Sequence, residues 1–503
     1  MTVSTPTDPV REMNPVRDPR ARAGLDSRRM APGPSPRSGS VPGPRPGTIL
    51  LALALLAPVV AGASNPESTP LSTEAALTGG AVLAGDDPAG AGWYNPAALG
   101  GLQRSSAQLG ASAYSVATTE VQGALVTVLP WGTSAADAVD RHYVSVPSVL
   151  SLSYKVRDGL GFSVGVWTPF HSTFAASIGG SSSGPYPGYP ALEASYEQSY
   201  SATYRWDDTW AGASIGWQAT PRLRVGASLQ GAYSTSSAVV DLDTGLQTNS
   251  TDPLEQGAHL NVSVRGDETY LAGRAVVGLQ WDATEELRLA LVLRSPAVQV
   301  AAWGQATRVT SVAALLPGFA PQQAQLLEQA DVAGGVSIVE VGRIYGGGAW
   351  SRGRWSVRLE GDWGPGLIRT LATERASWNV RGGALYQWDA NTCVGAGLFR
   401  EGARSRASEG RLALDTYGIS GGVDFRPEKV VRALGGGESW DLLTGIAVRA
   451  AFGVGHGPGM TVVPFDLSQS VLPIFPGQQG QGFQEVPARS FEGSLNFFTA
   501  LKF

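Results

Sequence analysis

Much of the chain alternates between apolar and polar residues with a period of two. Every second residue of Leu150–Val156 is apolar, and the alternation resumes at 160–166 after the turn Arg157-Asp158-Gly159. Successive side chains of a strand point to opposite faces, and Asp-Gly is a frequent hairpin turn. The same alternation recurs at 222–230, 287–294, 354–362, 379–388, 417–426 and 446–454. The pattern predicts an all-β fold whose strands each have one apolar and one polar face.

The connections between these segments differ in length in a regular way. Short turns are expected near 157–159, 219–221, 282–286, 351–353, 389–391 and 427–440, and long polar connections near 118–146, 168–207, 234–268, 296–335, 363–377, 400–412 and 455–486. Six short and seven long connections join 14 strands. An even strand count, with short turns at one rim and long loops at the other, is typical of outer-membrane barrels. A soluble β-sandwich has the same local alternation and is the alternative.

The C-terminal segment 491–503 favours the barrel. Its apolar face carries Phe491, Leu495, Phe497, Leu501 and Phe503. A terminal aromatic residue on such a strand resembles the sorting signal of bacterial outer-membrane barrels. Because open sheet edges are not tolerated in lipid, the strands must close on one another. We therefore predict a 14-stranded antiparallel transmembrane β-barrel.

The N-terminus is predicted to be an export signal. Residues 1–47 are rich in Pro, Ser and Arg, and a 13-residue apolar stretch follows at 48–60, too short for a spanning helix. Ala61-Gly62-Ala63 then supplies a small-residue cleavage site. Residues 1–63 would be this signal with a disordered basic extension. A start at Met30, or an uncleaved membrane anchor, remains open.

Composition excludes several functions. The formal charge is −5 with 16% charged residues, and no basic stripe for nucleic acid occurs beyond the N-terminal tail. Cys393 is the single cysteine, and the four histidines lack metal-ligand spacing. No nucleophile elbow or His-Glu-x-x-His motif occurs. We expect no enzymatic activity, no cofactor and no metal.

The segment 78–99 differs from the alternating strands. It contains a Gly/Ala-rich run, the pair Asp86 and Asp87, and then Asn95-Pro96-Ala97. It resembles the N-terminus of the FadL family of outer-membrane transporters. Further stretches up to about residue 300 and the last strand are similar too, whereas 335–486 agrees only in its alternation. The resemblance implies a hatch at 64–104, inside a barrel formed by 105–503.

Two sites follow from this resemblance. Asp86 and Asp87 would pair with inward arginines such as Arg224, Arg358 or Arg381, although no pairing can be chosen; a plain Asn-Pro turn with two solvated acids is the alternative. Pro169 interrupts the third strand, since proline cannot donate to the ladder. In FadL-type proteins a kink in this strand opens the wall sideways, so Pro169 is our candidate for a lateral opening. The alternative is that the strand ends at Thr168.

Capture of a hydrophobic solute requires apolar side chains in exposed loops. Residues 317–332 have helical spacing, which predicts a short amphipathic helix that either binds ligand or packs its loop. The candidates for ligand capture in the two long connections are Phe170, Phe174, Tyr186, Tyr189, Leu315, Leu316, Phe319, Leu326 and Leu327.

The resemblance implies passive uptake of long-chain fatty acids or aromatic hydrocarbons across the outer membrane of a Gram-negative bacterium. The expected partners are the hydrophobic ligand, outer-membrane lipid and lipopolysaccharide, and the barrel-assembly machinery. The barrel is expected to be monomeric and not to bind nucleic acid. A general porin for polar solutes and a structural or adhesive surface barrel are the rival interpretations.

Overall fold

The computed structural model describes residues 69–318, 321–368, 373–409, 411–427, 440–462 and 484–503. The chain divides into Met1–Pro44, which lies outside these residues, and Arg45–Phe503, to which all that follows refers. The predicted export signal and Phe319 also lie outside the described residues. No helix among the described residues is long and apolar enough to cross a membrane.

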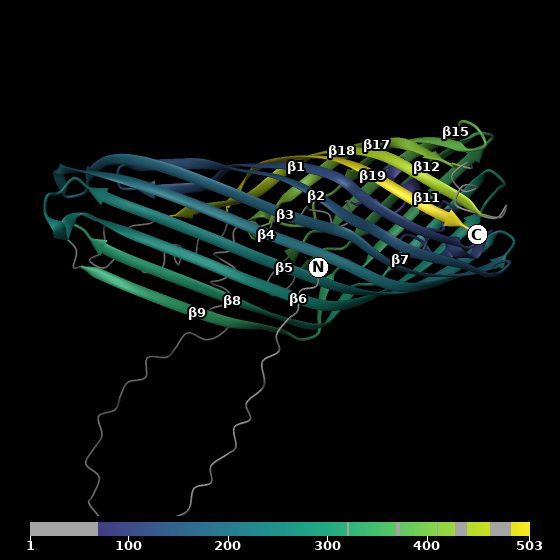
Figure 1. Ribbon diagram of the computed structural model, residues 1–503, viewed down its shortest axis with the longest axis horizontal. Helices are drawn as coiled ribbons and strands as arrows, with labels where there is room; N and C mark the ends of the chain where they lie inside the picture. The colour runs from purple at the N-terminus through teal and green to yellow at the C-terminus, as the bar shows by residue number, and fades with distance from the viewer. Residues whose placement is uncertain (1–68, 319–320, 369–372, 410, 428–439, 463–483) are drawn as a thin grey trace, which may run out of the picture. The chain divides into compact units, whose positions relative to one another are not determined.

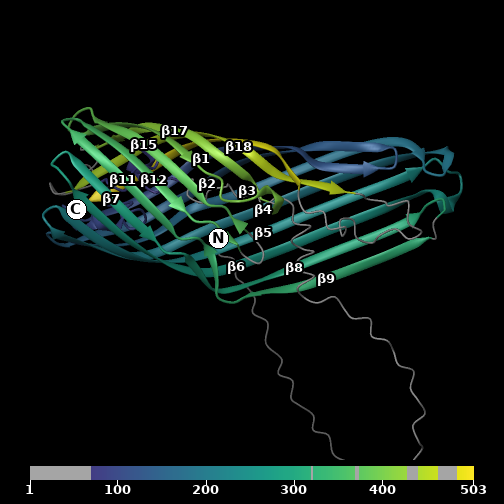
Figure 2. The same cartoon turned by 180° about the vertical axis from the view of Figure 1, so that it is seen from behind.

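A closed circuit of antiparallel pairs forms the barrel. Neighbouring strands pair in order from β1 to β7, then β7 pairs with β11, β11 with β12, and β12 with β15. Pairing continues from β15 through β19, and β19 pairs with β1 to close the ring. Figure 1 shows β1–β6 side by side, and Figure 2 shows β11, β12, β15 and β17 on the opposite wall. The bounds are β1 Ser106–Leu129, β2 Gly132–Arg157, β3 Leu160–Tyr186, β4 Tyr189–Thr220, β5 Leu223–Thr248, β6 Gly257–Asp282, β7 Leu287–Arg294, β11 Arg343–Arg352, β12 Trp355–Gly364, β15 Ser377–Gln387, β16 Thr392–Glu401, β17 Ala413–Phe425, β18 Asp441–Val462 and β19 Gln484–Lys502.

The sheet is larger than the predicted 14 strands and is mixed. It has 17 strands among the described residues, because β8, β9 and β10 attach outside the closed circuit. One short pairing, between β1 and β18, is parallel. The remaining elements are α2 Thr73–Leu77, η1 Pro96–Gly101, η2 Pro253–Glu255, η3 Ala407–Glu409, β8 Ala297–Leu315, β9 Gln322–Gly334, β10 Ser337–Glu340, β13 Leu367–Ile368 and β14 Thr373–Glu374.

Several predicted loops are strands. The stretches 118–146, 168–207 and most of 234–268 and 296–335 extend β1–β6 and form β8 and β9, so β4 alone has 32 residues. The helix predicted at 317–332 is wrong, because β9 occupies most of it and pairs with β8. Half-buried and exposed positions alternate along β9. The backbone bonds that β8 offers explain why strand pairing prevails over the helical spacing.

The long strands reverse their polarity part-way along. In the first half of β4 the buried positions include Tyr200 and Tyr204, while Ser, Thr and Glu occupy exposed positions. In the second half Ser214 is buried, and Ile215 and Trp217 are exposed. The ring therefore has a polar interior and an apolar exterior, and the extension has the opposite arrangement. The buried apolar side chains of the extension form the first core cluster, which includes Leu125, Phe174, Ile178, Val240, Leu260 and Val312.

Candidate functional site

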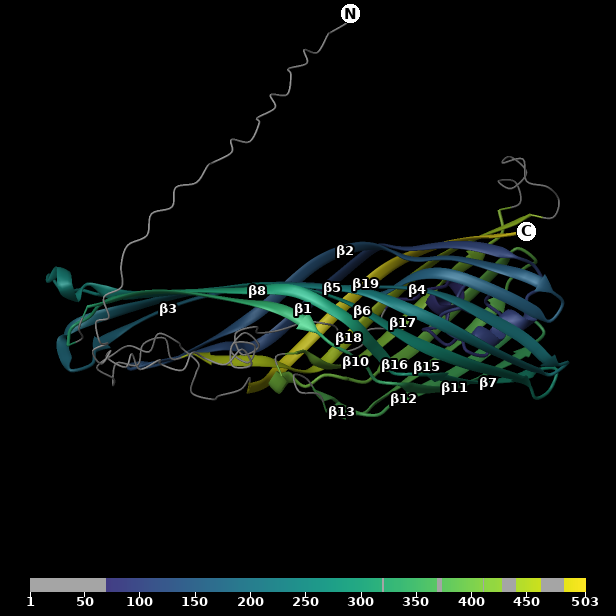
Figure 3. The same cartoon turned by 90° about the horizontal axis from the view of Figure 1, so that it is seen from below.

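Residues 69–104, which we call the N-terminal segment, contact strands on opposite sides of the ring. The helix α2 contacts β15–β19, and η1 contacts β3–β6. Figure 3 shows this purple segment among the strands of the ring. Most of its apolar side chains are buried, including Leu71, Leu77, Trp93 and Leu99.

The Asn95-Pro96-Ala97 motif starts η1 and anchors it. The Asn95 side chain accepts a hydrogen bond from Ala97 N at 3.1 Å, which caps η1. Its amide nitrogen donates to Leu83 O at 2.8 Å, which ties two parts of the segment together. Asn95 is 2% exposed, so the motif is a buried structural turn.

A row of glycines on the wall receives η1. Gly161, Gly216, Gly226 and Gly278 are register partners on the consecutive strands β3–β6. A Cβ at Gly226 would overlap Pro96, and one at Gly278 would overlap the Asn95 side chain. Close approach of two backbones needs glycine, and this row gives a role to four of the 65 glycines of the chain.

The two neighbouring aspartates have different surroundings. Asp86 lies 2.7 Å from Arg224 and 2.5 Å from Arg288, so it joins the N-terminal segment to β5 and β7. Desolvation would raise the pKa of Asp86, but the charges of Arg288 and Arg224 outweigh it and lower that pKa. The carboxylate of Asp87 accepts from Ala89 N at 3.1 Å. Burial, and then the nearby charge of Glu74, raise the pKa of Asp87 to about 6.

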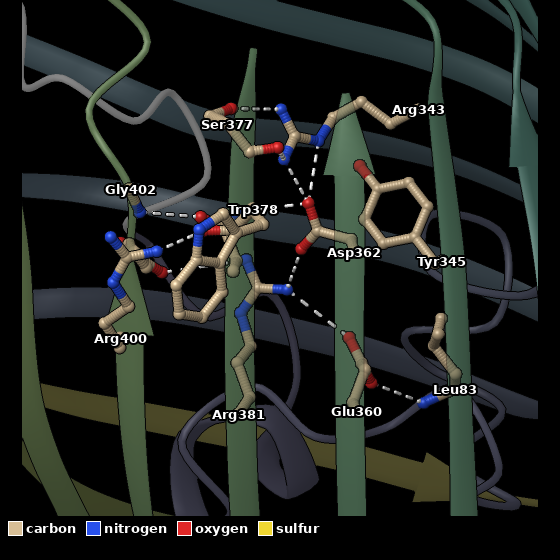
Figure 4. A network of polar contacts seen from close by, with 12 residues as sticks. Leu83, Arg343, Tyr345, Glu360, Asp362, Ser377, Trp378, Arg381, Arg400 and Gly402 are labelled. Atoms are coloured by element: carbon tan, nitrogen blue, oxygen red, sulfur yellow. Dashed lines mark hydrogen bonds and ion pairs between the residues drawn. The ribbon is translucent and has the colours of Figure 1, made fainter. Parts of the chain in front are cut away.

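The other two candidate arginines contact different acids. Arg358 is 2.6 Å from Glu74 of the N-terminal segment. Arg381 lies 2.9 Å from Asp362 and 3.4 Å from Glu360, within the wall (Figure 4).

Glu360 is a docking residue that the sequence analysis missed. Its carboxylate accepts hydrogen bonds from Val82 N at 2.9 Å and Leu83 N at 3.1 Å (Figure 4). The side chain is 3% exposed, and Arg381 compensates its charge. An acidic residue at an inward position between Arg358 and Asp362 was the available signal, but nothing in the spacing identified its partner.

A second missed group is an aromatic cluster around Trp93. Its ring lies 5.8 Å from that of Trp167 and 6.0 Å from that of Trp210. The Arg274 guanidinium lies over both Trp93 and Trp210, at 4.5 and 3.9 Å from the ring centroids. Such cation–π contacts are strengthened by burial. The cluster joins the N-terminal segment to the part of β3 that immediately precedes Pro169.

Pro169 lies inside β3, so the alternative that the strand ends at Thr168 is wrong. The register with β4 shifts between Trp167 and Phe170, as in a β-bulge. The ladder between β2 and β3 stops at the pair Val149–Trp167. Beyond it, within the described residues, β2 pairs only with β1 and β3 only with β4. We call this unladdered boundary, between 132–148 and 168–186, the seam.

Side chains bridge the seam in place of a ladder. Asp140, whose side chain is fully buried, accepts from Ala175 N at 2.9 Å. Its second oxygen lies 2.7 Å from His142 Nδ1. Farther along, Trp131 Nε1 donates to Ser182 Oγ at 3.1 Å. The seam is therefore closed by a few side-chain bonds.

Two pockets lie near Pro169 and the seam. The first, a narrow pocket partly open to solvent, is lined by Pro169 of β3, by Trp93 and Tyr94, and by wall residues such as Arg294 and Glu401. The second, also partly open to solvent and with room for little more than a water molecule, spans the seam, and we call it the apolar pocket. Its lining is Ala124, Leu125, Ala138, Phe174, Ala176, Ile178, Tyr200 and Met460.

The candidate capture residues are divided among several places. Phe170, Phe174, Tyr186 and Leu316 are buried, and only Phe174 of these lines the apolar pocket. Tyr189, Leu315 and Leu327 are exposed, and Leu326 is half-buried on β9. Phe503 follows β19, where its N–H donates to Ser105 O at 3.0 Å. The structure therefore brings Phe174, Tyr186 and Leu316 together in the apolar core of the extension, and the other described candidates lie outside that cluster.

No protein-family model and no curated protein sequence matches the chain. Among solved structures, a FadL homologue from Pseudomonas aeruginosa is similar with a TM-score of 0.52 at 14% identity, over 85% of this chain and 97% of that chain. The fold is that of a FadL homologue. The toluene transporters TodX from Pseudomonas putida and TbuX from Ralstonia pickettii have TM-scores of 0.48 and 0.47, at 15% and 14% identity. They cover 89% and 87% of this chain, and 99% of each of those chains.

Of these three structures, the FadL homologue from Pseudomonas aeruginosa has a TM-score above 0.5. The resemblance to FadL-type proteins in the sequence is thus confirmed at the level of the fold.

Proposed function

We propose that this protein takes up hydrophobic small molecules across the outer membrane of a Gram-negative bacterium. The observation that carries the proposal is the reversal of polarity along the long strands. The ring has exposed apolar side chains such as Leu229, Leu359 and Leu398, as a lipid-facing wall requires. The extension buries its apolar side chains instead, which suits a path for apolar solutes outside the bilayer.

Strand length supports this arrangement. A tilted strand crosses the hydrocarbon region in about 9–11 residues, and β4 has 32. The ring portion of β4 is sufficient to span, so the extension would project from the membrane. Exposed Ser, Thr and Glu on its outer face suit contact with water and lipopolysaccharide.

The N-terminal segment is proposed to be the hatch. Its contacts with opposite walls, through Glu360, Asp86 and the glycine row, support a role in blocking ion flow through the ring. Asp86, Asp87, Asn95, Pro96 and Ala97 would form its structural core. A general porin would instead require an open passage.

Lateral release is proposed at Pro169. The bulge there, the end of the β2–β3 ladder and the pocket that Pro169 lines support an exit through the wall. Replacement of Pro169 by Ala would test this step, because unchanged uptake would remove Pro169 from the mechanism. We further propose that Phe503 serves sorting by the barrel-assembly machinery, and that the barrel acts as a monomer.

Gene deletion tests the function. We expect slower growth on oleate or toluene as sole carbon source, restored by the wild-type gene, and the two substrates separate fatty acids from aromatic hydrocarbons. Growth that deletion leaves unchanged on both would favour a structural or adhesive barrel. Steady ion conductance of the wild-type protein in a planar bilayer would favour a porin.

A further inference from the structure

Arg274 of β6 connects the N-terminal segment with the wall. Its guanidinium lies over the rings of Trp93 and Trp210, and its Nε donates to Gln230 Oε1 at 2.7 Å. The Gln230 amide in turn donates to Gly92 O at 2.9 Å. The Arg274 side chain is 1% exposed, and burial strengthens both kinds of contact because water does not screen them. Arg274 therefore holds the part of the segment around Trp93.

The same guanidinium is bound by Glu340, the last residue of β10. Arg274 Nη1 donates to Glu340 Oε2 at 2.7 Å, and Arg404 lies 3.6 Å from the other carboxylate oxygen. Charge-assisted hydrogen bonds are shorter and stronger than neutral ones. Val339, the preceding residue, packs against the apolar cluster that contains Trp93. Because β10 lies outside the closed circuit, between β9 and β11 along the chain, a connection of the barrel contacts the surroundings of Trp93.

Trp93 itself lies beside the bulge in β3. Its ring is 5.8 Å from that of Trp167, where the ladder between β2 and β3 stops. Trp93 and Pro169 also line the same narrow pocket. A hydrophobic molecule that leaves the ring at Pro169 would therefore need Trp93 to move.

We propose that Glu340 is a positioning residue for the exit at Pro169. Through Arg274 it keeps Trp93 beside the bulge, so that displacement of β10 releases Trp93 and opens the exit. Only this part of the segment is released, because Glu360 holds another part through separate hydrogen bonds. This inference rests on the proposed lateral release and adds the contact that regulates it.

Hydrogen exchange of the full chain in lipid nanodiscs tests the positioning role. The amides of Trp93 and Tyr94 both donate to Gly90 O, at 3.0 and 2.8 Å, so their exchange reports on this part of the segment. We expect Glu340→Ala to speed their exchange about tenfold, as loss of one charge-assisted hydrogen bond predicts. Glu340→Gln, which keeps an acceptor oxygen, should restore part of the protection.

Two controls separate this effect from a general loosening of the protein. The amides of Val82 and Leu83, at a separate contact with the wall, should exchange at the wild-type rate in Glu340→Ala. Glu328→Ala removes a carboxylate that pairs with Arg308 in the extension and should leave both parts of the segment unchanged.

A double-mutant cycle tests whether Glu340 acts through Arg274. Arg274→Met removes the guanidinium and should itself speed exchange of the Trp93 amide. Glu340→Ala added to Arg274→Met should then speed it by less than about twofold more, because two residues that act through one contact are not additive.

Thiol labelling reports on the exit itself. In a chain with Pro169→Cys and Cys393→Ser, the rate of labelling by a maleimide should rise when Glu340→Ala is added. The proposal is overturned if Glu340→Ala leaves exchange at Trp93 or labelling at position 169 unchanged, if it speeds exchange at Val82 equally, or if its full effect persists with Arg274→Met. Neither readout involves transport, so a failure of uptake in cells would contradict the proposed function alone.

Discussion

At the scale of single residues, the docking of the N-terminal segment depends on wall positions without side chains and on one buried acceptor. Gly226 and Gly278 leave room for η1, and Glu360 supplies a buried acceptor for two backbone N–H groups. From the sequence, alternation identified inward arginines, and the motif identified Asn95 and Pro96. Neither signal could identify Glu360 or the glycine row, because their partners in the N-terminal segment are far away along the chain.

Gly226→Ala should release η1 from the wall, because its Cβ would overlap the backbone of Pro96. We expect steady ion currents for this variant in a planar bilayer. Gly231→Ala is the matched control on the same strand, since its Cβ would have no atom nearer than 3.8 Å. A Gly226→Ala protein as silent as the control would show that the segment does not block the ring.

Docking of the segment should weaken as pH rises from about 4 to 6. The pKa of Asp87 is raised from 3.8 to about 6, so the docked state binds this proton more tightly than the undocked state does. The free-energy advantage of the docked state is therefore lost as Asp87 ionises. Hydrogen exchange of residues 69–104, corrected for intrinsic rates, should be at least tenfold faster at pH 7 than at pH 4, since one pKa unit corresponds to a factor of ten.

Asp87→Asn should remove this pH dependence and keep the slow exchange at pH 7. Asp86→Asn, at the adjacent position, should instead speed exchange at pH 7, because it loses the ion pairs that lower the pKa of Asp86. Identical profiles for the two variants would contradict the different roles of the two aspartates.

At the scale of elements, the strand pattern was predictable and the extent of the strands was not. Short turns lie where Asp-Gly and similar signals place them, for example between β2 and β3. The expected long loops are strands. The sequence analysis missed them because polar residues on the outer face and small residues such as Ser and Gly concealed their alternation. The helix predicted at 317–332 failed because local spacing carries no information about pairing with β8.

The strength of the contacts across the seam can be measured by hydrogen exchange of the Ala175 amide. Asp140→Ala removes the carboxylate that accepts from Ala175 N, and one hydrogen bond of about 1 kcal/mol corresponds to roughly fivefold faster exchange of that amide. Asp241→Ala is the control, since the carboxylate that it removes accepts a side-chain hydrogen bond, from Ser263, across β5 and β6. Unchanged exchange of Ala175 would mean that Asp140 does not hold the seam.

At the scale of the whole molecule, one closed sheet serves two environments. The ring has apolar residues outside and charged networks inside, whereas the extension has polar residues outside and a large apolar cluster inside. Sequence alternation predicted both faces of each strand but not the reversal between them. Under the proposed function, this reversal gives the ring an outer face suited to lipid and gives the extension an apolar interior.

The most direct test is the rate at which radiolabelled toluene and oleate enter cells that lack their own channels for these compounds. Cells that produce the wild-type protein should take up at least one of them faster, and Phe174→Asp should abolish the gain by placing a charge in the apolar interior. Ser177→Asp, at an exposed position of β3, should retain it. Equal uptake with and without the protein, or wild-type uptake by Phe174→Asp, would contradict the account.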